Sequence, residues 1–325
     1  MSASLKSTAY WPIAGLALLS CTVISLFIGA IELSPASLLS NPESLWLMAA
    51  SRLPRTLAVL LTGTSLAIAG QVMQVLVQNR FVEPTTAGSG QSAILGIVLV
   101  TLWLPSSSIM MKMGLSSLAA LLGTGLFLLL VRKLPVRDTY LVPLVGIIYG
   151  GVIGAIAMWL AWQADLLQLV DIWLTGEFSG IIRGRYDFLW IAGALAIFSY
   201  YLADQFTIAS LGKDQARNLG LNYNTVLGLG LLVVSVVTAV TVVTVGIIPF
   251  IGLIVPNIVS RWRGDNLRKS LPMVAYLGAM LTLLCDVVGR LVIYPYEIPV
   301  GSIFGVVGAF ITLWLLYSSP SAQRA

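Results

Sequence analysis

The amino-acid sequence predicts an all-α integral membrane protein: one transmembrane domain over residues 1–325, built as a bundle of ten membrane-spanning helices with both termini in the cytoplasm. Two observations support this fold class. First, 58% of the 325 residues are hydrophobic and only 10% are charged, whereas about 25% of a soluble domain is charged. A soluble protein of this size could not bury so much apolar surface, so lipid must cover it. Second, the few charged residues are separated by long charge-free stretches.

These stretches define the helices in chain order. Nine of them contain sixteen or more residues without Asp, Glu, Lys or Arg, and about 20 apolar residues span a bilayer. The stretch 218–260 has 43 residues, about twice what one crossing needs, so it must fold back at a break that Gly246, Pro249 and Gly252 offer. The predicted helices are approximately 11–31, 53–77, 88–106, 114–132, 140–164, 188–204, 223–245, 248–263, 271–291 and 300–318.

The distribution of basic residues predicts the orientation. The first run is too long for a signal-peptide core and no convincing cleavage site follows it, so we expect it to remain as a membrane anchor. Ten crossings place both termini on one side. With the termini inside, the inner side holds Lys6, Arg80, Arg132, Lys133, Arg137, Lys213, Arg217, Arg261, Arg263, Arg268, Lys269 and Arg324, and the outer side holds Arg52, Arg55, Lys112, Arg183, Arg185 and Arg290. Because the inner side holds more basic residues than the outer side, both termini are predicted to be cytoplasmic.

Several classes of chemistry are excluded by residues that the chain lacks. It contains no histidine, which excludes imidazole metal sites and Ser-His-Asp triads. Its single Gly-Lys pair, Gly212-Lys213, lacks the other residues of a phosphate-binding loop. Gly88–Ala93 matches a dinucleotide-binding pattern by letters, but no strand precedes it. Cys21 and Cys285 lie in apolar runs and are expected to be small buried side chains. The net charge of +5 fits basic cytoplasmic loops, so no nucleic-acid partner is expected.

Glycines at a spacing of four residues indicate close helix packing. Gly146, Gly150 and Gly154 lie in the fifth predicted helix, and Gly301 and Gly305 lie in the tenth. Two interpretations remain open from the sequence: packing within this chain, or a face that lines a pathway or a contact with a second subunit.

Two polar regions are candidates for interactions with partners. Arg52, Arg55 and Arg290 lie at the outer side, where they could anchor the helices or bind acidic side chains of a soluble partner; Asp286 could also pair with Arg290, four residues on. On the inner side, the loop 207–222 contains an amphipathic turn between Gly212 and Gly220, with Ala216 and Leu219 on one face. This loop could rest on its own helices or present an apolar edge to a partner groove.

Five motifs together resemble the permeases of iron-siderophore and vitamin B12 importers, the FecCD-like family. They are Arg52-Leu-Pro-Arg55 with Gly70–Gln74, Asn79-Arg-Phe-Val-Glu-Pro84, Ala216–Gly220, Gly246–Asn257, and Asp286–Arg290 with Glu297–Gly301. Many members have histidine after the proline in the fourth motif, whereas here Pro256 is followed by Asn257. The motifs 79–88 and Asn257 are most similar to a subgroup that serves catecholate siderophores such as vibriobactin, enterobactin, anguibactin and petrobactin.

The resemblance implies a type II ATP-binding-cassette importer in a bacterial inner membrane. Its parts would be two permease subunits, which are often different chains in this subgroup, two cytoplasmic ATPase subunits that bind ATP and Mg, and a periplasmic binding protein. This chain would bind no cofactor itself, and a ferric siderophore would be the cargo. Vitamin B12 or haem is the alternative cargo, and an ion-coupled secondary transporter or a membrane enzyme is the alternative function.

The resemblance also implies roles for particular residues of this chain. The binding protein would dock on Arg52, Arg55 and Arg290. The ATPase would contact Lys213, Asp214, Ala216, Arg217, Leu219, Gly220 and Leu221. The gates would include Asn79, Phe81, Asp138 and Thr139, and the structural motif residues would be Pro249, Gly252, Pro256, Asn257, Asp286, Glu297, Pro299 and Gly301.

Overall fold

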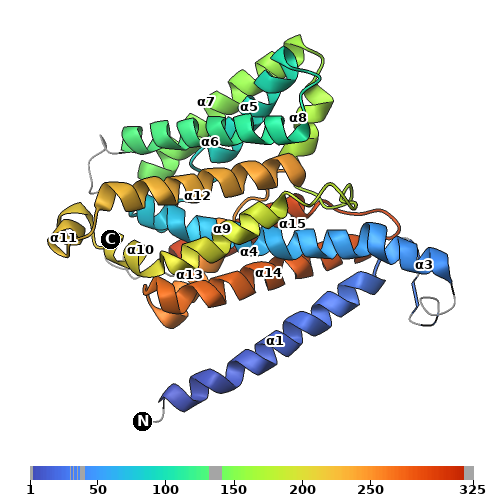
Figure 1. The fold of residues 1–325 in the computed structure, drawn as a ribbon, viewed down its shortest axis with the longest axis horizontal. Coiled ribbons are helices and arrows are strands. Elements are labelled where there is room, and N and C mark those ends of the chain that lie inside the picture. Colours follow the sequence, from blue (N-terminus) through green and yellow to red (C-terminus); the bar gives the residue numbers. More distant parts are fainter. Residues whose placement is uncertain are drawn as a thin grey trace.

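The computed structural model describes residues 3–29, 31, 33–34, 36, 41–131 and 141–317. Regular structure in these ranges is helical (Figure 1). The elements are α1 (Ala3–Phe27), α3 (Pro42–Leu47), the π-helical turn η1 (Met48–Arg52), α4 (Leu53–Val77), α5 (Ser89–Trp103), α6 (Ile109–Val131), α7 (Leu141–Gln163), α8 (Leu167–Leu174), α9 (Leu189–Tyr201), α10 (Ala203–Ala209), α11 (Lys213–Asn218), α12 (Tyr223–Thr244), α13 (Ile251–Arg263), α14 (Leu267–Leu291) and α15 (Val300–Tyr317).

Each of the ten predicted ranges contains a helix, which confirms the all-α membrane class. Judged by length and hydropathy, five described helical segments could cross a bilayer: the continuous segment Pro42–Val77, α6, α7, α12 and α14. The pair α9–α10, which is bent by 65°, would make a sixth. Shorter apolar helices are Trp11–Phe27 within α1, α5, and most of α15. The protein is therefore a multi-pass membrane protein, while the count of ten crossings remains a prediction.

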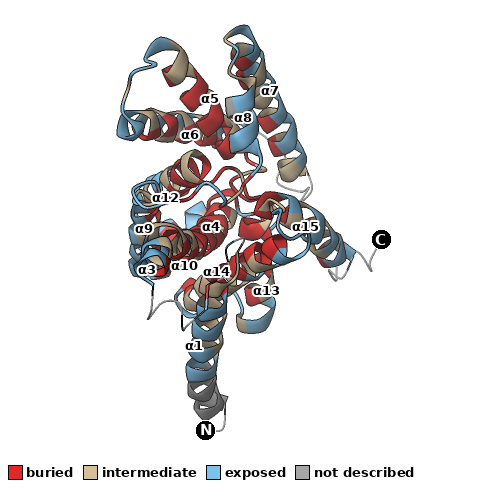
Figure 2. Ribbon diagram, turned by 90° about the vertical axis from the view of Figure 1, so that its right-hand side faces the viewer, coloured by how far each residue is buried: buried red, intermediate tan, exposed pale blue. Residues whose placement is uncertain are grey.

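Helix α4 is the centre of the structure. It packs against α9, α12, α13 and α14, and most of its residues are buried (Figure 2). Two glycines permit this contact, because a Cβ at Gly63 would lie 2.4 Å from the carbonyl oxygen of Gly278 and one at Gly70 would lie 2.1 Å from that of Gly252. In lipid, such small residues let helix backbones approach and gain dispersion contacts.

A second layer of helices, α5, α6 and α7, joins the first through α12 (Figure 1). The glycines of α7 face this layer: a Cβ at Gly146 would lie 2.3 Å from the carbonyl oxygen of Thr86, and one at Gly150 would lie 3.3 Å from the Cα atom of Gly88. Gly301 of α15 likewise approaches Gly176 within this chain. The structure supports packing within the chain for these glycines, whereas at Gly305 a Cβ would meet nothing within 4 Å and both interpretations stay open.

The break predicted in the stretch 218–260 lies between α12 and α13. Helix α12 ends at Thr244, and Gly246 (φ +97°) and Phe250 (φ +68°) then adopt left-handed backbone conformations. The connecting segment is held by backbone hydrogen bonds, since Ile247 N donates to Trp173 O at 2.8 Å and Gly176 N donates to Ile247 O at 3.2 Å. Helix α13 therefore begins inside the bundle, and its residues 251–257 are all buried.

Polar residues gather at the two ends of the bundle. At one end, which we call the α11 end, Arg80 pairs with Asp265 and Arg268 pairs with Asp204. Helix α1 starts and α15 finishes near this end, because Arg263 lies over the ring of Trp11 and Arg261 lies over that of Trp314. The opposite end, which we call the arginine end, contains η1 and the last turn of α14.

Candidate functional site

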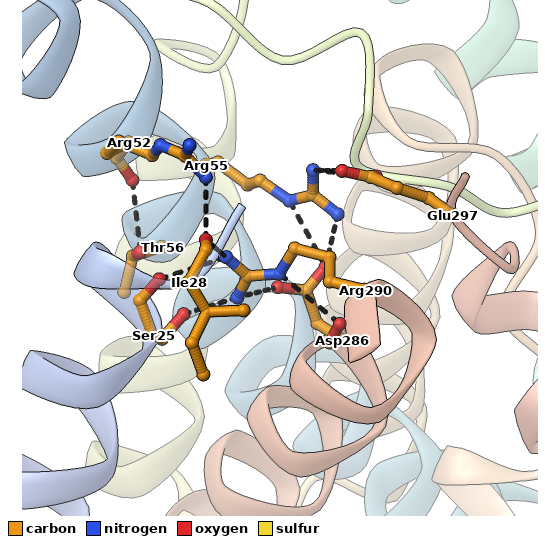
Figure 3. Close-up of polar contacts among 8 residues, drawn as sticks. All are labelled: Ser25, Ile28, Arg52, Arg55, Thr56, Asp286, Arg290 and Glu297. Atoms are coloured by element: carbon orange, nitrogen blue, oxygen red, sulfur yellow. Dashed lines mark hydrogen bonds and ion pairs between the residues drawn. The ribbon is translucent and has the colours of Figure 1, made fainter. Parts of the chain in front are cut away.

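The three predicted docking arginines meet at the arginine end in one network with two carboxylates (Figure 3). Asp286, in α14, is fully buried and accepts hydrogen bonds from both Arg55 and Arg290. The nearest nitrogen of Arg55 lies 2.8 Å from Asp286 Oδ1, and Arg290 Nη2 lies 2.6 Å from Asp286 Oδ2. Arg55 also pairs with Glu297 at 2.8 Å. The predicted pairing of Asp286 with Arg290 is confirmed.

Two of the arginines cap the end of α1. Helix α1 ends at Phe27 with no basic residue in its last turn, and the last carbonyl groups of a helix need partners. Arg290 Nη1 donates to the carbonyl oxygens of Ser25 (2.9 Å) and Ile28 (2.6 Å). Arg52 Nη1 donates to the same Ile28 oxygen at 2.6 Å, and its Nη2 donates to that of Ile31 at 2.9 Å. The cluster therefore holds α1, which otherwise diverges from the bundle (Figure 1).

Burial determines which part of this cluster a partner could reach. Arg52 and Arg290 are 8% and 3% exposed, whereas the side chains of Arg55 and Glu297 are 11% and 28% exposed. The cluster has a formal charge of +1, because it contains three arginines and two carboxylates. The docking role remains a prediction: all three arginines are largely buried, and Glu297 is the most exposed charged group of the cluster.

The predicted inner gate residues lie in the loop between α4 and α5. Asn79 Oδ1 accepts a hydrogen bond from Phe81 N at 2.9 Å, which folds this loop into a tight turn. The side chain of Asn257, in α13, donates to the carbonyl oxygen of Arg80 at 2.7 Å. The loop is thus tied to α13. The other two predicted gate residues, Asp138 and Thr139, lie outside the described residues.

Glu83 is a functional candidate to which the sequence analysis gave no role. Its side chain is buried, and its Oε1 accepts hydrogen bonds from Phe250 N at 2.8 Å and from Thr85 Oγ1 at 2.6 Å. The amide groups of Gly252 and Leu253 also face the carboxyl group, so Glu83 caps the buried start of α13. Burial raises the pKa of the Glu83 carboxyl above its ordinary value, although these hydrogen bonds act in the opposite direction. The signal was present: Glu83 is the last charged residue before the charge-free stretch 84–111.

The predicted coupling segment forms a short surface helix, α11, between two glycines with positive φ, Gly212 (+99°) and Gly220 (+80°). Ala216 is fully buried against the body of the protein, while Leu219 is 63% exposed. These two residues therefore do not share one exposed face, because α11 ends at Asn218 and Leu219 lies in the turn that follows. Lys213, Asp214 and Arg217 are exposed and Leu221 is half-buried.

The remaining motif residues support backbone contacts. Pro249 precedes α13, Gly252 touches Gly70, and Pro256 lies within α13. At the start of α15, Pro299 O accepts hydrogen bonds from Ser302 N and Ile303 N, and Gly301 N donates to Gly176 O at 2.8 Å. These residues shape the helix breaks and contribute no reactive group.

Comparison with known proteins gives one consistent result. The sequence profile of the FecCD transport family matches residues 17–318. The chain is 44% identical to the petrobactin import system permease protein of Bacillus subtilis, covering 92% of this chain and 95% of that protein. It is 40% identical to the ferric-anguibactin transport system permease protein of Vibrio anguillarum, covering 94% and 98%. It is 33% identical to the vitamin B12 import system permease protein of Vibrio cholerae, covering 92% and 90%.

The fold has a counterpart among solved structures. A structure described as a metal-chelate type ABC transporter in an inward-facing conformation superposes with a TM-score of 0.80 at 25% identity, covering 94% of this chain and 98% of that one.

Proposed function

The chain belongs to the FecCD transport family, and from that premise we propose that it is the permease subunit of an ATP-binding-cassette importer that carries a ferric siderophore of the catecholate type into the cell. One observation carries the choice of cargo. Identity is 44% and 40% to the permeases for petrobactin and ferric anguibactin, and 33% to that for vitamin B12, over comparable coverage.

The proposed assembly lies in the bacterial inner membrane. This chain would cross it ten times with both termini in the cytoplasm, beside a second permease subunit that is a different homologous chain or an identical copy. Two ATPase subunits, which bind ATP and Mg, would contact α11, and a periplasmic binding protein would contact the arginine end. The separation of α11 and the arginine cluster at opposite ends of the bundle supports this arrangement.

The proposed mechanism involves no covalent chemistry in this chain. ATP binding and hydrolysis in the partners would move α11, and the helices would expose the pathway alternately to the two sides of the membrane. Because the side chain of Asn257 in α13 donates a hydrogen bond to the loop that contains Asn79, the inner gate would move together with α13. A wide, mainly apolar wall suits a bulky chelate better than a bare cation, which prefers converging oxygen ligands.

The test is ATPase activity of the complex reconstituted with its binding protein, measured against a panel of ferric chelates, vitamin B12 and haem. We expect ferric catecholates to stimulate hydrolysis and to accumulate in vesicles. Stimulation by vitamin B12 or haem, without stimulation by ferric catecholates, would change the proposed cargo but leave the proposed role as a permease intact. Uptake that survives ATP depletion and collapses with the proton gradient would favour an ion-coupled secondary transporter and contradict the proposal.

A charge substitution tests the docking surface. Arg55→Gln should weaken association with the binding protein about tenfold, because one charge-assisted hydrogen bond is lost, and should reduce the salt dependence of binding. The neutral residue is preferable to glutamate, which would place a second carboxylate beside buried Asp286. Arg80→Gln at the α11 end is the control. Unchanged affinity of the Arg55 variant at low ionic strength would argue against docking at this residue.

A backbone substitution tests the coupling segment. Gly220 lies in the turn that follows α11 and has φ +80°, and Leu221 N donates across this turn to Ala216 O at 3.0 Å. Left-handed backbone costs a residue other than glycine about 1–2 kcal/mol, so Gly220→Val should distort the turn, reduce uptake and abolish the stimulation of ATPase activity by loaded binding protein. Gly228→Val, at an uncrowded glycine within α12, is the matched control. Normal stimulated ATPase activity in the Gly220 variant would refute the assignment.

A further inference from the structure

A groove of about 600 Å³ runs along the outer surface between α4, α9 and α14, away from the arginine cluster and the gate loop. Its walls are almost entirely apolar and include Leu61 and Ile68 from α4, Ala194 and Ile197 from α9, and Pro272 from α14. Such an apolar surface is suited to contact with the acyl chains of lipid.

Small residues on α9 make the surface hollow. Gly193 allows α9 to approach α4, since a Cβ there would lie 2.8 Å from Leu61 Cδ2. Ala194 is exposed and leaves open the space that a larger side chain would fill. The 65° bend between α9 and α10 then turns the chain toward α14, against which α10 packs. Helix α10 therefore lies beyond the end of the groove that is nearest to α11.

The end of the groove nearest to α11 carries positive charge. Tyr200 lines the groove, and Arg268 Cζ lies 5.6 Å from the centroid of its ring. On α14, Arg268 shares a helical face with the groove residues Leu271, Pro272 and Ala275, which follow it at intervals of three, four and seven residues. Arg268 and Lys269 are exposed, and Asp204 is the carboxylate paired with Arg268. Two cations and one anion leave a net positive charge at the end of an apolar groove.

The length of the groove matches one lipid tail. Trp190 and Tyr200 both line it and are ten residues apart on α9, which corresponds to about 15 Å. This distance is about half the thickness of the hydrocarbon core, the depth that an acyl chain occupies in its own leaflet.

We propose that the groove between α4, α9 and α14 is a specific site for an anionic phospholipid, with one acyl chain along Ala194 and the phosphate group at Arg268 and Lys269. The orientation in the proposed function would assign this lipid to the cytoplasmic leaflet, where anionic head groups attract basic residues. The site itself depends only on the groove and its charged end.

The test uses the purified full-length chain, stripped of lipid and titrated with phosphatidylglycerol or phosphatidylcholine while bound lipid is counted by native mass spectrometry. Ala194→Phe fills the groove from its open side, and Arg268→Gln with Lys269→Gln removes the charge. The matched controls are Leu122→Phe, at an exposed position of α6, and Arg183→Gln with Arg185→Gln, two exposed cations elsewhere. Thermal unfolding curves establish that each variant is folded.

We expect the unmodified chain to retain one phosphatidylglycerol tightly and to prefer it about tenfold over phosphatidylcholine. Ala194→Phe should weaken the binding of both lipids at least tenfold, and the charge variant should lose the preference while keeping the affinity for phosphatidylcholine. The two control variants should behave as the unmodified chain does. Equal binding of both lipids by the unmodified chain, or full retention of phosphatidylglycerol by either groove variant, would overturn the proposal.

Discussion

Replacing Asp286 by alanine should unfold the arginine end of the protein and abolish transport. The carboxylate is fully buried between Arg55 and Arg290, and no other carboxylate in the cluster reaches Arg290 in the described structure. Removing one partner of a buried ion pair costs about 3–5 kcal/mol, because the remaining charge keeps its desolvation penalty without compensation. Thermal unfolding of the purified chain in detergent, followed by uptake into vesicles, measures both effects.

Asp265→Ala is the matched control for Asp286→Ala. Asp265 also pairs with an arginine, Arg80, but both side chains are at least 60% exposed, and an exposed pair contributes less than about 1 kcal/mol. The control variant should therefore unfold close to the temperature of the unmodified chain. If the two variants lost the same stability, the buried network would not hold α1 and α14 in the way described above.

The helices that could be predicted from the sequence are those whose length matches the thickness of the membrane. The break between α12 and α13 followed from a 43-residue stretch that is too long for one crossing, together with Gly246. The bend between α9 and α10 was not predicted, because Leu202 at the bend is flanked by Tyr201 and Ala203 and no glycine or proline marks it. The short helices α3 and α8 were not predicted either, because neither is long enough to cross a membrane.

Contacts over long sequence distances explain what was missed at the site. Helical spacing predicted the pair Asp286 and Arg290, four residues apart, but not the pair of Asp286 with Arg55, whose positions differ by 231. From the sequence, the three arginines could be helix anchors or docking groups, and the family resemblance favoured docking. The sequence could not show that two of them bind the carbonyl oxygens at the end of α1, because backbone acceptors have no signature in a sequence.

Glu83→Ala should destabilise the start of α13 and disable the inner gate. The substitution removes the acceptor of the 2.8 Å hydrogen bond from Phe250 N and exposes other amide groups of the first turn of α13 to an apolar space. A buried donor left without a partner costs about 1–3 kcal/mol, and Phe250 already holds a left-handed conformation that the cap must stabilise. The expected result is a loss of roughly 3 kcal/mol of stability and of coupled uptake, measured by thermal unfolding and vesicle transport.

Glutamine at the same position separates the hydrogen bonds of Glu83 from its charge. Because burial raises the pKa of the Glu83 carboxyl, the fold favours the neutral form, and any stability gained by protonation is present at low pH and lost as pH rises through the raised value. Glu83→Gln keeps a neutral oxygen acceptor, so it should unfold near the unmodified chain and remove this pH dependence. If Glu83→Gln lost as much stability as Glu83→Ala, the negative charge of Glu83 rather than its oxygen acceptor would stabilise α13. The start of α13 would then depend on a buried carboxylate at the positive end of the helix dipole.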